Sequence, residues 1–150
     1  MSNIRIFVSH RIDIDSETVD TPVYFPVRCG AVYDESNSEI QGDDTGDNIS
    51  KLRMSFCEFT VQYWAWKNVD ADYYGLCHYR RYLSFSDKHY KNTAFNMVRE
   101  LRLTAHEKKK YHLDDTKKIN SVVQKYDMII PGLAKASEMS YNRAEVKTLR

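Results

Sequence analysis

The sequence contains few cysteines, and they are widely scattered. Cys29, Cys57 and Cys77 lie far apart and include no Cys-x-x-Cys pair. An odd, dispersed set of this kind excludes a disulfide framework and the paired ligands of a zinc site. Reduced thiols are typical of cytosolic proteins, so we expect all three cysteines to be free and without metal.

The chain also lacks a long hydrophobic run and an excess of charge of one sign. No apolar segment reaches the roughly 20 residues that cross a membrane, and the apolar stretch after residues 1–5 is too short for a signal peptide. The net charge is only +1, so no overall field attracts the protein to nucleic acid or to anionic lipid. These absences predict a cytoplasmic protein with no transmembrane segment.

Tyrosine stands out in a composition that is otherwise ordinary. The 150 residues suffice for one domain with a buried core, and 42% hydrophobic and 29% charged residues are typical of a soluble globular protein. Eleven tyrosines suit pockets in which a ring packs while its hydroxyl forms a hydrogen bond, as sugar and nucleotide sites require. We interpret residues 1–150 as a single domain.

Short apolar runs predict the strands of a sheet. Residues 4–9 are rich in branched and aromatic side chains and predict a buried first strand. Residues 22–27 are extended, but Pro26 has no backbone donor, which confines the segment to a sheet edge or an irregular piece. Residues 73–79 and 127–131 predict two further buried strands.

Apolar residues at helical spacing predict three helices between these strands. The first covers residues 56–67, and Ser55 with Glu58 three residues later matches a capping box at its start. The third has cap candidates at residues 114–116. The apolar positions that mark the three helices are, in order, Phe56, Phe59, Tyr63 and Trp66; Phe95, Val98, Leu101 and Ala105; and Ile119, Val122, Val123 and Tyr126.

The alternation of strands and helices implies an α/β fold with a mostly parallel sheet. A nucleotide-binding sheet normally has more strands than the sequence provides here. The chain after Gly132 is polar and has no clear apolar period. We therefore expect an α/β domain that is incomplete at its C-terminus.

The largest cluster of side chains suited to binding a ligand lies at the end of the strand predicted at 73–79, where His78, Arg80 and Arg81 stand together. In open α/β sheets ligands bind beyond the carboxyl ends of the strands, and arginine presents a rigid fork of donors that fits phosphate. Successive side chains of a strand point in opposite directions, so only one arginine is expected to face the ligand. The pattern predicts a site for a phosphorylated small molecule; the alternative is a surface strand end whose arginines pair with acids such as Asp72.

Two polar segments have both a functional and a structural interpretation. Asp70 and Asp72 form an Asp-x-Asp pair of the kind that holds Mn or Mg, but they precede the strand, so a helix-to-strand turn with solvated carboxylates is favoured. In the loop at residues 42–50, Asp47 and Asn48 could contact a ribose, a base or a sugar hydroxyl, because the glycines allow close approach of the backbone. The same residue types also form an ordinary turn.

The aromatic helix at 56–67 is interpreted as structural. Tyr63 and Trp66 are predicted to pack in the core rather than to stack against a sugar. Glu58 is assigned to the capping box, so we do not expect it to act as a catalytic base.

Five segments occur in one order and together carry a resemblance to a known family. They are Ile6-Phe7-Val8-Ser9-His10, Gly42-Asp43-Asp44-Thr45-Gly46-Asp47-Asn48-Ile49-Ser50, Cys57-Glu58-Phe59-Thr60, Tyr63-Trp64-Ala65-Trp66-Lys67-Asn68 and Gly75-Leu76-Cys77-His78-Tyr79-Arg80-Arg81-Tyr82. The chain thereby resembles the bacterial family of domain of unknown function 4422 (DUF4422), over roughly residues 4–131. Its members are similar to glycosyltransferases of capsular and exopolysaccharide assembly. They continue well beyond the point where this chain stops, so the chain looks truncated, with a divergent tail at 132–150.

The resemblance implies a Rossmann-like, GT-A-type nucleotide-sugar fold and a hexosyltransferase, with galactosyl and galactofuranosyl groups among the candidates. The implied partners are a nucleotide diphosphate sugar and a saccharide or lipid-linked acceptor, with a divalent metal and peripheral membrane association as further options. No residue is indicated as the catalytic base. The residues implied to bind the substrate are Ser9 and His10 for the nucleotide, Asp47 and Asn48 for ribose or sugar, and His78, Arg80 and Arg81 for the diphosphate.

Two alternatives to a transferase stay open. A non-enzymatic module could hold single-stranded nucleic acid through stacking and phosphate contacts at residues 78–82. The near-neutral charge and the acidic loop at residues 35–47 disfavour this interpretation, because phosphate-binding surfaces usually carry a basic stripe. The other alternative is an inactive, truncated relic that still folds.

Overall fold

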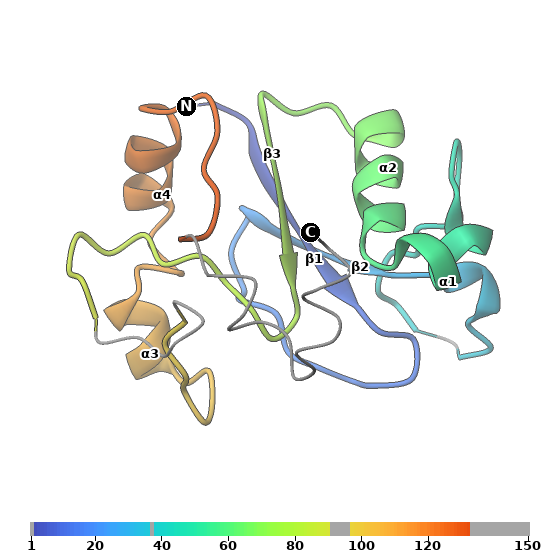
Figure 1. Cartoon of the computed structure of the whole chain (residues 1–150), viewed down its shortest axis with the longest axis horizontal. Coiled ribbons are helices and arrows are strands. Elements are labelled where there is room, and N and C mark those ends of the chain that lie inside the picture. The colour runs from blue at the N-terminus through green and yellow to red at the C-terminus, as the bar shows by residue number, and fades with distance from the viewer. Residues whose placement is uncertain (1, 37, 91–96, 133–150) are drawn as a thin grey trace, which may run out of the picture.

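The computed structural model describes residues 2–36, 38–90 and 97–132, and its centre is a small parallel sheet (Figure 1). The strands are β1 (Ile4–His10), β2 (Tyr24–Arg28) and β3 (Tyr73–His78), in the order β2-β1-β3. Both neighbours run parallel to β1. The predicted α/β fold with a parallel sheet is confirmed, and β2, with its proline, lies at an edge as expected.

The strand register brings the carboxyl ends of all three strands to one edge of the sheet. Ser9 lies opposite His78 of β3, and His10 lies opposite Arg28 of β2. The chain leaves β1 for β2 on one side and later returns to β3 on the other, so β1 marks a topological switch. Ligands of open α/β sheets bind at such an edge.

The two faces of the sheet are covered by different elements, as Figure 1 shows for α2 on one side and α3 and α4 on the other. On one face Phe7 of β1 packs with Val61 and Trp64 of α2 (Phe59–Asn68), and the Phe7 and Trp64 rings meet edge to face with centroids 6.3 Å apart. On the other face Ile6 and Val8 share a core cluster with Ile119. Because β1 is buried on both faces, its sequence is almost continuously apolar.

The first predicted helix is interrupted. The structure forms α1 (Arg53–Phe56) and α2, and between them Cys57 has a positive φ of 47°, a conformation that breaks the helical path. Glu58 stands at the N-cap of α2 but makes no capping bond with its side chain. The predicted capping box is therefore wrong.

The buried face of α2 differs from the predicted one. Trp64 is only 4% exposed, whereas Trp66 is 62% exposed and lies under the ammonium group of Lys67, 3.8 Å from the ring centroid. Tyr63 is partly buried, and its hydroxyl donates to Asp47. Trp64, rather than Trp66, anchors the helix on the sheet.

A buried carboxylate fixes the loop before α2. Asp43 is 0% exposed, and its two oxygens accept from the backbone N–H groups of Gly30 and Ala31, both at 2.9 Å. They also accept from the hydroxyls of Ser50 at 2.6 Å and Thr60 at 2.5 Å. One side chain thus ties the end of β2, the 3-10 helices at Ala31–Tyr33 and Ser50–Leu52, and the start of α2.

The second half of the chain is less regular than predicted. Of the second predicted helix, Phe95 lies outside the described residues, and Leu101 is exposed in an irregular segment ahead of the short α3 (Ala105–Lys110). Residues 127–131 form no strand, so that prediction is wrong. Their apolar side chains stay exposed, because the segment does not pair with the sheet.

The third predicted helix is confirmed as α4 (Thr116–Val123). The Asp115 side chain caps it by accepting from the backbone N–H of Lys118 at 2.9 Å. Ile119 faces the core and is completely buried. Among the helices that the structure describes, none is long and apolar enough to cross a membrane.

The three cysteines are free thiols. Cys29 is buried, and burial raises the pKa of Cys77 to about 12, so that this thiol is protonated at neutral pH. Cys57 is exposed at the break between α1 and α2.

Candidate functional site

A tight turn follows β3 at the carboxyl edge of the sheet. The Arg81 backbone N–H donates to the His78 carbonyl at 2.8 Å, and the Arg80 N–H donates to Nδ1 of the His78 ring at 3.2 Å. The turn therefore has a defined shape before any ligand arrives. It presents two exposed arginines in succession beyond the end of a strand.

His78 is held by the turn on one side and faces Glu58 on the other. Its Nε2 lies 3.7 Å from a carboxylate oxygen of Glu58. Because Nδ1 accepts a hydrogen bond, the neutral ring carries its proton on Nε2. Burial lowers the pKa of His78, and the Glu58 carboxylate opposes this shift while Arg80, Arg81 and Arg11 add to it. Glu58, assigned from its spacing to a cap, is instead a partner of this histidine.

The guanidinium of Arg80 rests on an aromatic support. It lies 5.0 Å from the centroid of the buried Tyr79 ring. That ring stacks against His10 at 6.1 Å and lies tilted against His78 at 4.2 Å, both measured between ring centroids. Cation–π contact of this kind restrains the side chain without neutralising its charge. Arg80 is thus a positioned cationic donor at the surface.

A hollow of about 590 Å³ opens beside this arginine. Tyr79 and Arg80 form one wall, residues 14–17 of the loop after β1 form another, and residues 102–104 close it. Arg102, which the sequence motifs did not indicate, contributes a second guanidinium to the lining. Nothing in the local sequence around Arg102 points to a ligand, because only the tertiary fold brings it to the end of β3.

Ser9 and His10 lie beneath this surface. They are 3% and 1% exposed, and the His10 ring nitrogens are engaged by Ser16 Oγ at 2.7 Å and Thr18 Oγ1 at 2.6 Å. Neither side chain offers free surface to a ligand in this conformation. Through Ser16 and Thr18, His10 holds the loop after β1, which lines the hollow.

The buried His10 predicts a pH dependence of stability. Burial, with the nearby charges of Arg28 and His78, lowers the pKa of His10 below its ordinary value of 6.5. The unfolded chain therefore takes up a proton first as the pH falls. The stability that the folded protein gains from a neutral, buried His10 is complete above pH 6.5, and it is lost as the pH falls through the folded-state pKa of this residue.

We expect the thermal midpoint to fall between about pH 7.5 and pH 5.5, a range above the titration of most carboxylates. His10→Gln should reduce this fall, because the group that takes up the proton is gone. The lowered pKa of His78 acts in the same direction and accounts for the remainder. A wild-type midpoint that stays constant or rises over this range would contradict the assignment.

Arg28 is a second residue at this edge that the motifs did not indicate. It is buried at the end of β2, pairs with the carboxylate of Asp34, and donates to the Ile12 carbonyl. Its charge is thus used within the protein. We assign it to holding the loops after β1 and β2 rather than to a ligand.

Asp47 and Asn48 are not brought to the hollow. The Asp47 carboxylate accepts a hydrogen bond from the Tyr63 hydroxyl at 3.1 Å. The Asp47 backbone N–H donates to the side chain of Asn68, the last residue of α2. Glu58, which faces His78, stands at the other end of this helix, about 15 Å away for ten residues. The Asn48 side chain donates to the carbonyls of Asp44 and Gly46 and shapes its own loop.

Asp70 and Asp72 lie at the opposite, amino-terminal edge of the sheet, between α2 and β3 as expected. An Asp72 oxygen accepts from the Asn3 backbone N–H at 2.7 Å, and the Asn3 side chain donates to the Asp70 carbonyl at 2.9 Å. These two carboxylates do not share a site with Arg80 and Arg81, because the cationic turn is at the other end of β3. Over residues 2–36, 38–90 and 97–132, no three His, Cys, Asp or Glu side chains gather as a metal site.

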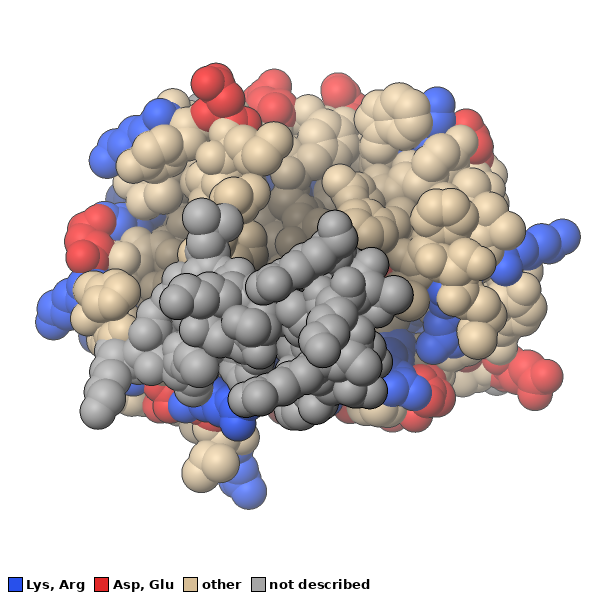
Figure 2. Space-filling view, viewed as in Figure 1, with Lys and Arg blue, Asp and Glu red and all other residues tan. Residues whose placement is uncertain are grey.

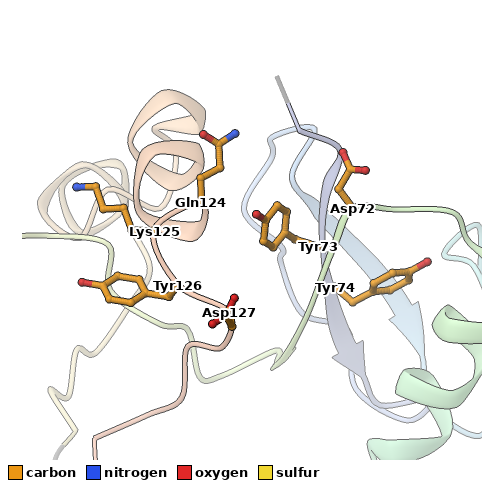
Figure 3. A pocket seen from close by; sticks show the side chains of 7 residues that line it. All are labelled: Asp72, Tyr73, Tyr74, Gln124, Lys125, Tyr126 and Asp127. Atoms are coloured by element: carbon orange, nitrogen blue, oxygen red, sulfur yellow. The ribbon is translucent and has the colours of Figure 1, made fainter.

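A second hollow, of about 550 Å³, lies beside Asp72 (Figure 3). In the close-up Tyr73 points from β3 toward the segment after α4, Tyr74 points to the other side, and Lys125 and Tyr126 extend away from the strand. The Tyr74 hydroxyl is used to bond the Val69 carbonyl at 2.6 Å. This hollow does not present convergent cationic groups, and we do not assign the site to it.

The fold and the carboxyl edge define an α/β protein with a parallel sheet and a turn with two exposed arginines beyond the end of β3. Comparison with known proteins agrees with this class. Residues 5–148 match the family described as Domain of unknown function (DUF4422), and the chain belongs to this family. The family match extends beyond the segment 4–131 that carries the sequence motifs. No curated protein matches the chain.

One solved structure is similar to this chain. It is the apo structure of WbbM, a bifunctional glycosyltransferase, with a TM-score of 0.74 and 34% sequence identity. The similarity covers 83% of this chain and 22% of the WbbM chain. The chain therefore corresponds to a limited part of that protein. The predicted resemblance to DUF4422 is confirmed.

Proposed function

We propose that this chain forms the nucleotide-sugar-binding part of a glycosyltransferase. The observation that carries the proposal is the Arg80 turn at the carboxyl edge of the sheet, in a chain 34% identical to part of a glycosyltransferase. Transfer of a glycosyl group leaves a nucleoside diphosphate with developing negative charge. Fixed cationic donors stabilise such charge at little reorganisation cost.

The residues at the carboxyl edge have different roles in holding the diphosphate. Arg80 contacts the diphosphate, Arg81 adds positive potential beside it, and His78 keeps the turn in shape through its Nδ1 acceptor. His10 supports the loop that lines the hollow from beneath, through Ser16 and Thr18. Asp47 and Asn48 stand at the other end of α2 and have no part in this contact.

The transferred group is proposed to be a hexosyl group, with galactosyl and galactofuranosyl groups among the candidates. The acceptor is proposed to be a growing polysaccharide or a lipid-linked saccharide. These details follow from the resemblance drawn from the sequence motifs, whereas the WbbM similarity, which covers 22% of that chain, supports glycosyl transfer in general.

The charge distribution counts against single-stranded nucleic acid as the ligand. Figure 2 shows acidic and basic side chains interspersed around one face, with no continuous basic stripe among the described residues on it. The net charge of the chain is +1. A nucleic-acid surface usually shows clustered Lys and Arg.

A thermal-shift screen tests the proposal. A ligand bound only by the native state raises the free energy of unfolding, by about 2.7 kcal/mol at a ligand concentration of 100 Kd. For a domain of this size the thermal midpoint then rises by roughly 5–10 °C. Uridine, guanosine and thymidine diphosphate sugars should include at least one that raises the midpoint, and a single-stranded oligonucleotide should not. A shift with the oligonucleotide and none with any nucleotide sugar would favour the binding module instead.

A further inference from the structure

We propose that Arg102 is a second anion-binding residue of this site and forms, with Arg80, a two-arginine clamp for the diphosphate of a sugar nucleotide. The inference rests on the proposed function and adds to it a residue and a substrate class. It is carried by the convergence of two arginines from distant segments on one hollow. Arg80 comes from the turn after β3, and Arg102 comes from the segment that leads into α3.

The backbone on both sides of Arg102 is anchored. Leu103 packs against the core cluster of the sheet, and the Thr104 carbonyl accepts the first helical hydrogen bond of α3 from Lys108 at 3.0 Å. The acid nearby, Glu100, is held by the ammonium group of Lys110 at 2.7 Å and by the Tyr111 hydroxyl. The segment that carries Arg102 is therefore held beside the hollow that this residue lines, and Glu100 is already paired elsewhere.

The other charged residues that line the hollow restrict the class of ligand that fits it. Asp15 and Glu17 line the same hollow as the two arginines. Carboxylates repel a bare polyanion, but they accept hydrogen bonds from hydroxyl groups. A ligand with an anionic diphosphate and a polyhydroxylated sugar satisfies both sets of groups, and a hollow of about 590 Å³ is within the size range of small-molecule sites.

Arg81 is not the second member of the clamp, since it does not line the hollow. The second guanidinium that lines the hollow is instead that of Arg102. Two guanidiniums that line one hollow can hold the two phosphates of one diphosphate, each through a forked pair of donors.

Calorimetric titration of the whole chain with inorganic pyrophosphate and with uridine diphosphate galactose tests the clamp. Arg102→Ala should weaken binding of both probes about tenfold, and Arg102→Lys should recover only part of the loss, because lysine keeps the charge without the fork. Arg99→Ala is the matched control. Arg99 is an exposed arginine three residues away that does not line the hollow, so its loss should leave both affinities unchanged. Thermal midpoints of all variants should match the wild type, since both arginines are exposed.

Each alternative outcome has a distinct meaning. If Arg102→Ala binds both probes as tightly as the wild type while Arg80→Ala binds them weakly, the clamp is wrong and the proposed function stands. If Arg102→Ala and Arg99→Ala weaken binding equally, the effect is general charge and the clamp is again wrong. If the wild type binds neither probe, the clamp and the proposed site in this chain both fail.

Discussion

Replacing Arg80 with alanine should weaken binding of a nucleotide diphosphate sugar by tens- to hundreds-fold. The side chain is preorganised over Tyr79 and lines the hollow at the end of β3. Loss of a charge-assisted, forked contact with phosphate costs on the order of 2–3 kcal/mol, which corresponds to this range of affinity. Titration calorimetry with the nucleotide sugar that gives the largest thermal shift measures the effect.

Arg81→Ala is the matched control for this experiment. It removes the same charge from the neighbouring position in the same turn, and we expect a loss of only a few-fold, from long-range potential alone. Arg80→Lys should recover a fraction of the binding. Equal losses in Arg80→Ala and Arg81→Ala would show that the turn acts as an undirected patch of charge. Normal binding by Arg80→Ala would remove the residue from the site.

Asp43→Ala should be the most destabilising single change in the 42–50 loop, with a loss of about 3–5 kcal/mol. The carboxylate is completely buried and accepts from two backbone N–H groups and two hydroxyls. Alanine leaves the N–H groups of Gly30 and Ala31 without their acceptor in a place closed to water, and each such group costs about 1–3 kcal/mol. Urea denaturation followed by circular dichroism gives the free energy of unfolding.

The neighbouring Asp44→Ala provides the comparison. Asp44 is exposed, and the one contact that involves it, from Asn48, goes to its backbone carbonyl, which alanine keeps. We expect a change within about 0.5 kcal/mol. A loss of similar size in the two variants would mean that general loop charge, rather than the buried network, stabilises this region.

The elements that the sequence predicts well are those with strong local signals. The apolar run of β1 and that of β3 locate both strands to within one residue, and the cap at Asp115 with the period through Ile119 locates α4. Parallel pairing follows from the alternation with helices, and it correctly brings His10 and His78 to one edge. The carboxyl-edge part of the candidate site could therefore be located before the structure was known.

The face of α2 could not be read from periodicity. Two sets of apolar residues share this helix, and both have helical spacing. The set with Phe59, Tyr63 and Trp66 is the more aromatic, but the sheet buries Val61, Trp64 and Ala65. The choice depends on the direction from which the helix enters, which the positive φ of Cys57 sets, and no local rule predicts that conformation for a cysteine.

The other differences have a nonlocal cause. Residues 127–131 resemble a strand because they are apolar, but a strand forms only by pairing, and this segment pairs with neither edge strand of the sheet. Arg102 belongs to an exposed, charged segment with no motif, and only the packing of Leu103 on the core brings it to Arg80. Sequence spacing indicates which residues are chemically suited to a site, but long-range packing decides which of them meet.

The crystal structure of this chain in complex with a uridine diphosphate sugar tests the central claim most directly. We predict that the diphosphate lies at the carboxyl edge of the sheet, with its oxygens within hydrogen-bond distance of the Arg80 and Arg102 guanidiniums. The sugar should point toward Asp15 and Glu17. Binding in the hollow beside Asp72 at the opposite edge, or at the carboxyl edge without contact to Arg80, would contradict this account.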